Sequence, residues 1–360
     1  MEILSEIRNR IAFITLNRPA ALNALSLNMV IRLRALLDGY AADSGVYAIC
    51  IGGAGEKAFC AGGDIRALYA SIKDADLLSH QFFVNEYSLD YLLYSFPKPY
   101  VVLMDRIIMG GGMGIAQSAR LRIVSERSRI AMPEVAIGFF PDVGGSFFLS
   151  RMPGSLGIYL GLTAVEINGV DAIYGQLADI YLPINAIDSL QNDLTALQWT
   201  DDRIADLQSF INARAEHHLP TSALSTLRAG IDTHFSHSSV REILASLETE
   251  RRNEYADWAQ QTIKRMRSHS PTMLNVTLRQ LQQGKNMNLA DCFRMELTMT
   301  RRCVEHGDFL EGVRALLIDK DNSPHWQPNR FEEVTQELVD TFFHSQWTST
   351  AHPLAPLGNG

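Results

Sequence analysis

The chain has 360 residues, of which 46% are hydrophobic and 20% charged, and its formal net charge is −8. A chain of this length buries a large core and predicts two or three domains, and none of its apolar runs is long enough to span a bilayer. The excess of acidic side chains repels a phosphate backbone on average, which argues against nucleic acid as a partner and leaves room for a small anionic ligand.

The first half of the chain alternates strand and helix patterns. Short apolar and β-branched runs predict strands over residues 10–16, 46–51, 100–104 and 120–126, and helical periodicity predicts helices from Ser26 to Gly39 and over residues 79–95. This alternation is typical of crossover units around a largely parallel sheet. The sequence therefore predicts an α/β core over residues 1–190.

Beyond about residue 190 the strand patterns disappear and helical periodicity dominates. The clearest helix is predicted over residues 270–284, where Ser270 suits the N-cap, Pro271 the first turn and Gly284 the stop. A helical C-terminal region is therefore predicted over residues 191–345. The remaining residues, 346–360, are rich in Pro, Gly and small polar residues and predict a disordered tail.

The four cysteines, Cys50, Cys60, Cys292 and Cys303, form no C-x-x-C pair and have no His cluster beside them. Neither a metal site nor a disulfide framework is expected from this spacing. Residues 1–16 have the features of neither a secretory signal nor an Arg-rich transit peptide. With free thiols favouring a reducing compartment, we expect a cytoplasmic protein.

Two glycine-rich stretches, "KAFCAGGDI" (57–65) and "MGGGMG" (109–114), follow apolar runs and precede helices. In each, glycines leave backbone N–H groups free to point at a ligand, and a helix N-terminus binds a phosphate or a developing oxyanion. The alternatives are a tight turn with Asp64 as a cap, and close packing of helix on sheet. Neither a G-x-G-x-x-G fingerprint nor a P-loop is present.

A third stretch, "EVAIGFFPDVGGS" (134–146), places Glu134 and Asp142 among apolar residues and glycines. Carboxylates in such surroundings are either satisfied by backbone N–H groups or act as a base or nucleophile whose pKa is tuned by apolar neighbours. Together the three stretches contain backbone N–H donors and carboxylates, which is the minimum equipment for acyl chemistry at a carbonyl group.

The segments "ITLNRPAALNALS" (14–26), "KAFCAGGDI", "MGGGMG" and "MPEVAIGFFPDVGGSFFLSRMPG" (132–154) together resemble the crotonase (enoyl-CoA hydratase/isomerase) superfamily. "FFVNEY" (82–87) and the later segments over 270–281 and 308–326 are similar to its 3-hydroxyisobutyryl-CoA hydrolase branch. The resemblance implies a crotonase-like ββα superhelix, an α/β core followed by a helical region. It also implies an acyl-CoA thioester as the small-molecule substrate, no separate cofactor, and a homo-oligomeric state that differs among relatives.

The resemblance also implies roles for individual residues. The N–H groups of Gly63 and Gly111 match the oxyanion hole, and Glu86, Glu134 and Asp142 match acids that contact the substrate. The residues that match the coenzyme A site are Ala21, Leu22, Asn23, Ala24, Leu25, Ala61, Gly62, Gly63, Asp64 and Ile65.

The carboxylates bear on which reaction of the superfamily is expected. Hydratases use two glutamates; the second matches Glu134, but the first falls at Gly114, which has no acid or base to offer. An isomerase works with Glu134 alone and leaves Asp142 without a role. The hydrolase branch carries both acids, which favours hydrolysis of short 3-hydroxyacyl-CoA thioesters, as in valine catabolism. A hydratase or isomerase and a non-catalytic family member remain the alternatives.

Overall fold

The computed structural model describes residues 1–358 and contains two compact units, each assembled from three chain segments. The first unit comprises residues 1–64, 88–131 and 166–223. The second unit comprises residues 65–87 and 132–165, together with the described chain from residue 224 onward. The predicted regions 1–190 and 191–345 are instead continuous stretches of the chain. The division of the chain into those two domains stays a prediction.

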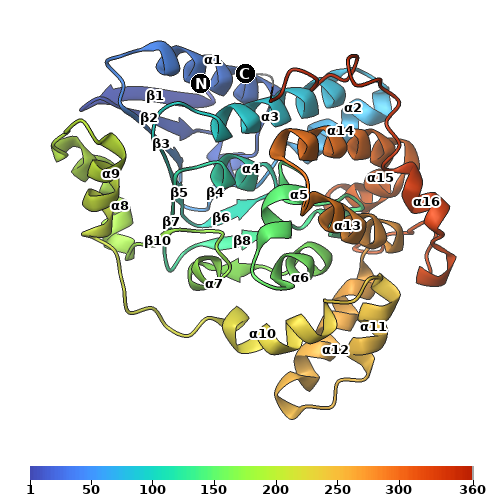
Figure 1. Ribbon diagram of the computed structural model, residues 1–360. Coiled ribbons are helices and arrows are strands. Elements are labelled where there is room, and N and C mark those ends of the chain that lie inside the picture. Colours follow the sequence, from blue (N-terminus) through green and yellow to red (C-terminus); the bar gives the residue numbers. More distant parts are fainter. Residues whose placement is uncertain (359–360) are drawn as a thin grey trace. The chain divides into compact units, whose positions relative to one another are not determined.

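The first unit contains two sheets, whose strands are drawn as arrows in Figure 1. The larger sheet has the order β1-β2-β3-β5-β7-β10, in which all neighbours are parallel except β1 and β2. Its strands are β1 (Ile3–Arg8), β2 (Ile11–Leu16), β3 (Ala48–Gly53), β5 (Tyr100–Met104), β7 (Leu121–Val124) and β10 (Ile180–Tyr181). The smaller sheet consists of β4 (Ala58–Cys60), β6 (Ile107–Met109), β8 (Arg129–Ala131) and β9 (Ile167–Asn168) in that order.

Five helices of the first unit follow strands of the two sheets along the chain. They are α1 (Leu27–Ala42), α4 (Gly111–Gln117), α7 (Gly169–Tyr174), α8 (Ile184–Asp193) and α9 (Arg203–Asn212). Alternate strand residues such as Ile11 and Phe13 face the same core as Leu190 of α8 and Ile211 of α9. This period of two is what places one face of each strand against helices.

The second unit is built from helices among its described residues. They are α2 (Ile65–Asp74), residues 78–87 of α3 (Leu78–Tyr94), α5 (Gly145–Phe148), α6 (Leu156–Thr163), α10 (Ala223–His234), α11 (Val240–Glu248), α12 (Asn253–Ser268), α13 (Pro271–Gly284), α14 (Leu289–His306), α15 (Asp308–Val313) and α16 (Gln336–Thr341). The cap of α13 follows its sequence, because Ser270 accepts a hydrogen bond from the N–H of Met273 and Pro271 occupies the first turn.

Residues 346–358, for which the sequence predicts a disordered tail, form turns in the structure. Leu354 is buried, and its carbonyl accepts a hydrogen bond from the Arg294 guanidinium of α14. Burial of an apolar side chain and a satisfied carbonyl order this segment. The last two residues of the predicted tail, 359 and 360, lie outside the described chain.

Candidate active site

Two glycine-rich turns of the first unit lie directly against each other. A Cβ atom at Gly112 would lie 2.4 Å from the carbonyl oxygen of Cys60, so only glycine fits at this position. Gly62 adopts a φ of +106°, which side chains rarely tolerate, and a Cβ there would lie 3.7 Å from the nitrogen of Gly111. The predicted turns "KAFCAGGDI" and "MGGGMG" therefore meet through their backbones.

The two N–H groups predicted as oxyanion donors come from these turns. Gly111 is the first residue of α4, so its N–H has no acceptor within the helix. Throughout residues 1–358, no backbone carbonyl accepts a hydrogen bond from the N–H of Gly63. Both groups are available to a carbonyl oxygen that gains negative charge, and their role in catalysis stays a prediction.

The segments predicted to bind coenzyme A also meet within the first unit. Leu25 and Gly63 form an isolated parallel bridge. Further backbone hydrogen bonds run from Ala61 N–H to Leu22, from Leu25 N–H to Gly62 and from Asp64 N–H to Leu25. The Asn23 side chain is fully buried and donates to the carbonyls of Ala54 and Ala58, so it shapes this segment and is not available to a ligand. Ile65, the last residue of the predicted set, begins α2 in the second unit.

Glu134 begins a one-turn 3₁₀ helix, Glu134–Ile137, in the second unit. Its side chain is buried, and its Oε2 atom has no hydrogen-bond partner within the described chain. Burial, and then the nearby charge of Asp142, raise the pKa of Glu134 well above its ordinary value of 4.5. A buried carboxyl with a free oxygen and a raised pKa is suited to accept a proton or to attack a carbonyl carbon.

Asp142 lies in the turn that precedes α5 and is also buried. Its Oδ2 atom accepts a 2.8 Å hydrogen bond from the phenol of Tyr87, which α3 positions. Burial raises the pKa of Asp142, and the hydrogen bond from Tyr87 works in the opposite direction. Both acids paired in the sequence therefore lie in the second unit, where the charge of Asp142 contributes to the raised pKa of Glu134.

Glu296 of α14, which no sequence motif singled out, holds the Asp142 turn. Its two carboxyl oxygens accept hydrogen bonds of 2.9 Å from the N–H groups of Gly144 and Ser146. Burial raises the pKa of Glu296 to about 8, although the two hydrogen bonds act to lower it. The available signal is its position on the buried apolar face of α14, three residues after Phe293 and one before Leu297.

Gln280 of α13 holds the same turn from a second helix. Its side-chain amide donates to the carbonyl of Pro141 and to the hydroxyl of Ser146. The turn needs this support because Val143 has a φ of +51°, which is costly for a β-branched residue. Two buried polar side chains therefore fix the backbone on which Asp142 stands.

Glu86, the remaining acid predicted to contact substrate, is buried on α3 directly before Tyr87. The structure places it in the second unit with Glu134 and Asp142. Its predicted contact with a ligand stays a prediction. Across residues 1–358 no group of three or more His, Cys, Asp or Glu side chains is arranged to hold a metal ion, and none of the helices found there is long and apolar enough to cross a membrane.

The model of a protein family described as enoyl-CoA hydratase/isomerase matches residues 11–343. The chain belongs to this enoyl-CoA hydratase/isomerase family. The family predicted from the glycine-rich and acidic motifs is thereby confirmed.

Several known proteins resemble the chain over nearly its whole length. A protein of Danio rerio named "3-hydroxyisobutyryl-CoA hydrolase, mitochondrial" is 40% identical over 348 residues, covering 96% of this chain and 90% of the relative. A solved enoyl-CoA hydratase from Rhodobacter sphaeroides has 37% identity and a TM-score of 0.87, covering 96% and 98% of the two chains. A carnitinyl-CoA dehydratase from Mycobacterium thermoresistibile has 35% identity and a TM-score of 0.88, covering 96% of each chain. These structures confirm the predicted crotonase-like α/β fold.

The expected cytoplasmic location is wrong. The Danio rerio relative and other vertebrate relatives carry "mitochondrial" in their names. The prediction failed because four free cysteines favour a reducing compartment but do not distinguish one reducing compartment from another.

Proposed function

We propose that this chain hydrolyses short 3-hydroxyacyl-CoA thioesters, with 3-hydroxyisobutyryl-CoA as the preferred substrate. The observation that carries the proposal is the pair of buried acids in the second unit, Glu134 with an unpartnered oxygen and Asp142 held by Tyr87. Relatives about 40% identical are named 3-hydroxyisobutyryl-CoA hydrolase, in agreement with the activity predicted from the sequence.

Hydrolysis breaks the carbon–sulfur bond, adds a water oxygen to the acyl carbon and delivers a proton to the departing thiolate. We assign Glu134 either as the base that activates water for direct attack, or as a nucleophile that displaces the thiolate and forms a mixed anhydride, which water then cleaves to release the acid and restore Glu134. The N–H groups of Gly63 and Gly111 stabilise the carbonyl oxygen as it becomes negative. Asp142 accepts a hydrogen bond from the 3-hydroxyl group of the substrate.

Hydration of an enoyl-CoA is the second candidate, because one of the similar structures is described as an enoyl-CoA hydratase. Hydration needs proton transfer at two places, and family hydratases use a second glutamate for it. The matching residue here is Gly114, which is buried within α4 and carries no ionisable group. The acid pair therefore favours hydrolysis over hydration.

The proposed function is tested by measuring thiol release from a panel of acyl-CoA thioesters beside hydration of crotonyl-CoA. We expect thiol release from 3-hydroxyisobutyryl-CoA to exceed release from isobutyryl-CoA, and hydration of crotonyl-CoA to be slow. The kcat/KM for straight-chain 3-hydroxypropionyl-CoA should differ from that for the branched substrate by no more than about 200-fold. One methyl group in a hydrophobic pocket supports only limited discrimination. Rapid hydration without thiol release would show the hydratase assignment to be correct.

Asp142→Asn is expected to lower kcat/KM for 3-hydroxyisobutyryl-CoA by about 10-fold to 100-fold, since an amide accepts a weaker hydrogen bond from the hydroxyl than a carboxylate does. Isobutyryl-CoA has no hydroxyl and should be affected less. Thiol release from both substrates measures the two constants. An equal loss on both would contradict hydroxyl binding by Asp142.

A further inference from the structure

The phenol of Tyr87 lies between two polar side chains inside the second unit. Its oxygen is 2.8 Å from Oδ2 of Asp142 and 2.9 Å from the hydroxyl of Thr300 on α14. All three side chains are buried, with Tyr87 fully so. A polar contact this deep is costly to break, because the carboxylate that loses its donor finds no water in exchange.

The single proton of the phenol decides which group donates in each of these two hydrogen bonds. A phenol has one proton, and Tyr87 donates it to Asp142. The Thr300 hydroxyl must therefore donate to the phenol oxygen, which polarises the phenol and strengthens its bond to the carboxylate. Because burial also raises the pKa of Tyr87 well above 10, the phenol keeps its proton and acts as a donor.

The ring of Tyr87 is fixed by aromatic neighbours and not by its hydroxyl alone. Its centroid lies 5.7 Å from the ring of Phe293 in a stacked arrangement and 6.0 Å from Phe83. Phenylalanine at position 87 would keep these contacts and lose only the oxygen. The substitution Tyr87→Phe therefore removes the hydrogen bonds of this side chain without changing its ring packing.

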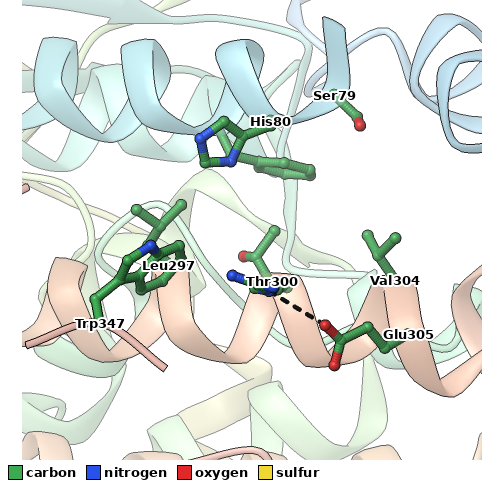
Figure 2. Close-up of a pocket in the computed structure, with 9 residues that line it drawn as sticks. Ser79, His80, Leu297, Thr300, Val304, Glu305 and Trp347 are labelled. Carbon is green, nitrogen blue, oxygen red and sulfur yellow. Dashed lines mark hydrogen bonds and ion pairs between the residues drawn. The ribbon is translucent and has the colours of Figure 1, made fainter. Parts of the chain in front are cut away.

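Thr300 is also a wall residue of a pocket of about 430 Å³ between α3 and α14. Figure 2 shows Thr300 on α14 on the side that faces His80 of α3. The lining of this pocket mixes apolar side chains such as Leu297 with charged ones such as Arg301. The Thr300 hydroxyl lies 2.9 Å from the phenol oxygen of Tyr87, so it has a hydrogen-bonding role besides lining the pocket.

We propose that Tyr87 is a positioning residue that orients the Asp142 carboxylate and thereby gives the enzyme its preference for acyl groups with a 3-hydroxyl. The proposal rests on the proposed function of the site. By holding Oδ2, Tyr87 fixes the rotation of the carboxyl group and directs its remaining acceptor capacity to one place. Thr300 supports this orientation through the phenol.

The test compares wild type, Tyr87→Phe and Tyr94→Phe by thiol release from 3-hydroxyisobutyryl-CoA and isobutyryl-CoA. We expect Tyr87→Phe to lower kcat/KM about 10-fold for the hydroxylated substrate and less than about 2-fold for the other. Tyr94, exposed on the same helix, provides the same chemical change and should preserve the preference. Equal effects of Tyr87→Phe on both substrates, or none, would overturn the proposal.

The pH profile provides a readout that a purely structural role would not move. The bond from Tyr87 lowers the pKa of Asp142, so its loss should shift the acid limb for the hydroxylated substrate to higher pH. Of the described residues, the other ionisable groups that act on or respond to Asp142 are Glu134, Glu296 and Cys303, which the substitution leaves in place. An unshifted acid limb would count against the proposal.

Thr300→Val is the second variant, should Tyr87→Phe fold poorly. It removes only the outer hydrogen bond, so we expect the same loss of preference at a smaller size, about 2–5-fold. If Thr300→Val keeps the wild-type preference for the hydroxylated substrate, the proposal that the Thr300 hydroxyl supports Tyr87 and Asp142 is overturned. Failure of the proposed function is recognised separately, because wild type would then release no thiol from either substrate.

Discussion

Glu134→Gln is expected to lower kcat for thiol release from 3-hydroxyisobutyryl-CoA by about 10²–10⁴-fold, the usual contribution of a positioned base. Glutamine has nearly the same shape but neither accepts the proton of water nor attacks a carbonyl carbon. Removing a buried carboxyl should not reduce stability, because its ionised form is disfavoured by burial. Thiol release and a melting curve measure the two effects.

The pH dependence of the wild type checks the same residue. Because the pKa of Glu134 is raised, the carboxylate required for either role forms only at pH values well above 4.5. Activity should therefore rise with pH above that value. Glu254→Gln, at an exposed position of α12, is the matched control and should retain wild-type activity. Wild-type kcat in Glu134→Gln would remove this residue from the mechanism.

Glu296→Ala is expected to destabilise the protein and to reduce activity together. It leaves the buried N–H groups of Gly144 and Ser146 without acceptors, at a cost of about 1–3 kcal/mol each. The strained Val143 between Asp142 and Gly144 then loses part of its support, so the Asp142 turn should relax. Denaturant unfolding and thiol release measure the two losses.

Two variants calibrate this result. Glu305→Ala breaks a partly exposed ion-pair cluster on the same helix and should cost at most about 1 kcal/mol. Glu296→Gln keeps one acceptor oxygen and should fall between wild type and alanine. A cost for Glu296→Ala no larger than that of Glu305→Ala would show that the two hydrogen bonds do not hold the turn.

The pKa of Glu296 also predicts how stability depends on pH. The pKa of Glu296 is about 8 in the folded protein and about 4.5 when unfolded. Its contribution to the free energy of unfolding is therefore fully present below about pH 4.5 and is lost as pH rises through about 8. Wild type should therefore lose stability over this range to a greater extent than Glu296→Gln, which does not titrate.

Local patterns account for the elements that the sequence predicted correctly. The predicted strand 100–104 is β5, and the predicted helix 270–284 is α13 with its cap at Ser270. Continuous apolar runs and capping residues act over a few positions, so they are legible without tertiary contacts. The break between α11 and α12 at residues 249–252 is a detail that no local pattern predicted.

By itself, the amino-acid sequence determined the family, the α/β class and the pairing of Glu134 with Asp142, because these depend on motifs whose residues are close along the chain. Only the tertiary structure showed what holds Asp142. Tyr87 and Glu296 lie 55 and 154 positions away from it along the chain, since 142 − 87 is 55 and 296 − 142 is 154. Hydrogen bonds between such distant residues depend on how helices pack, and that packing follows from the burial of the whole core and not from any local pattern.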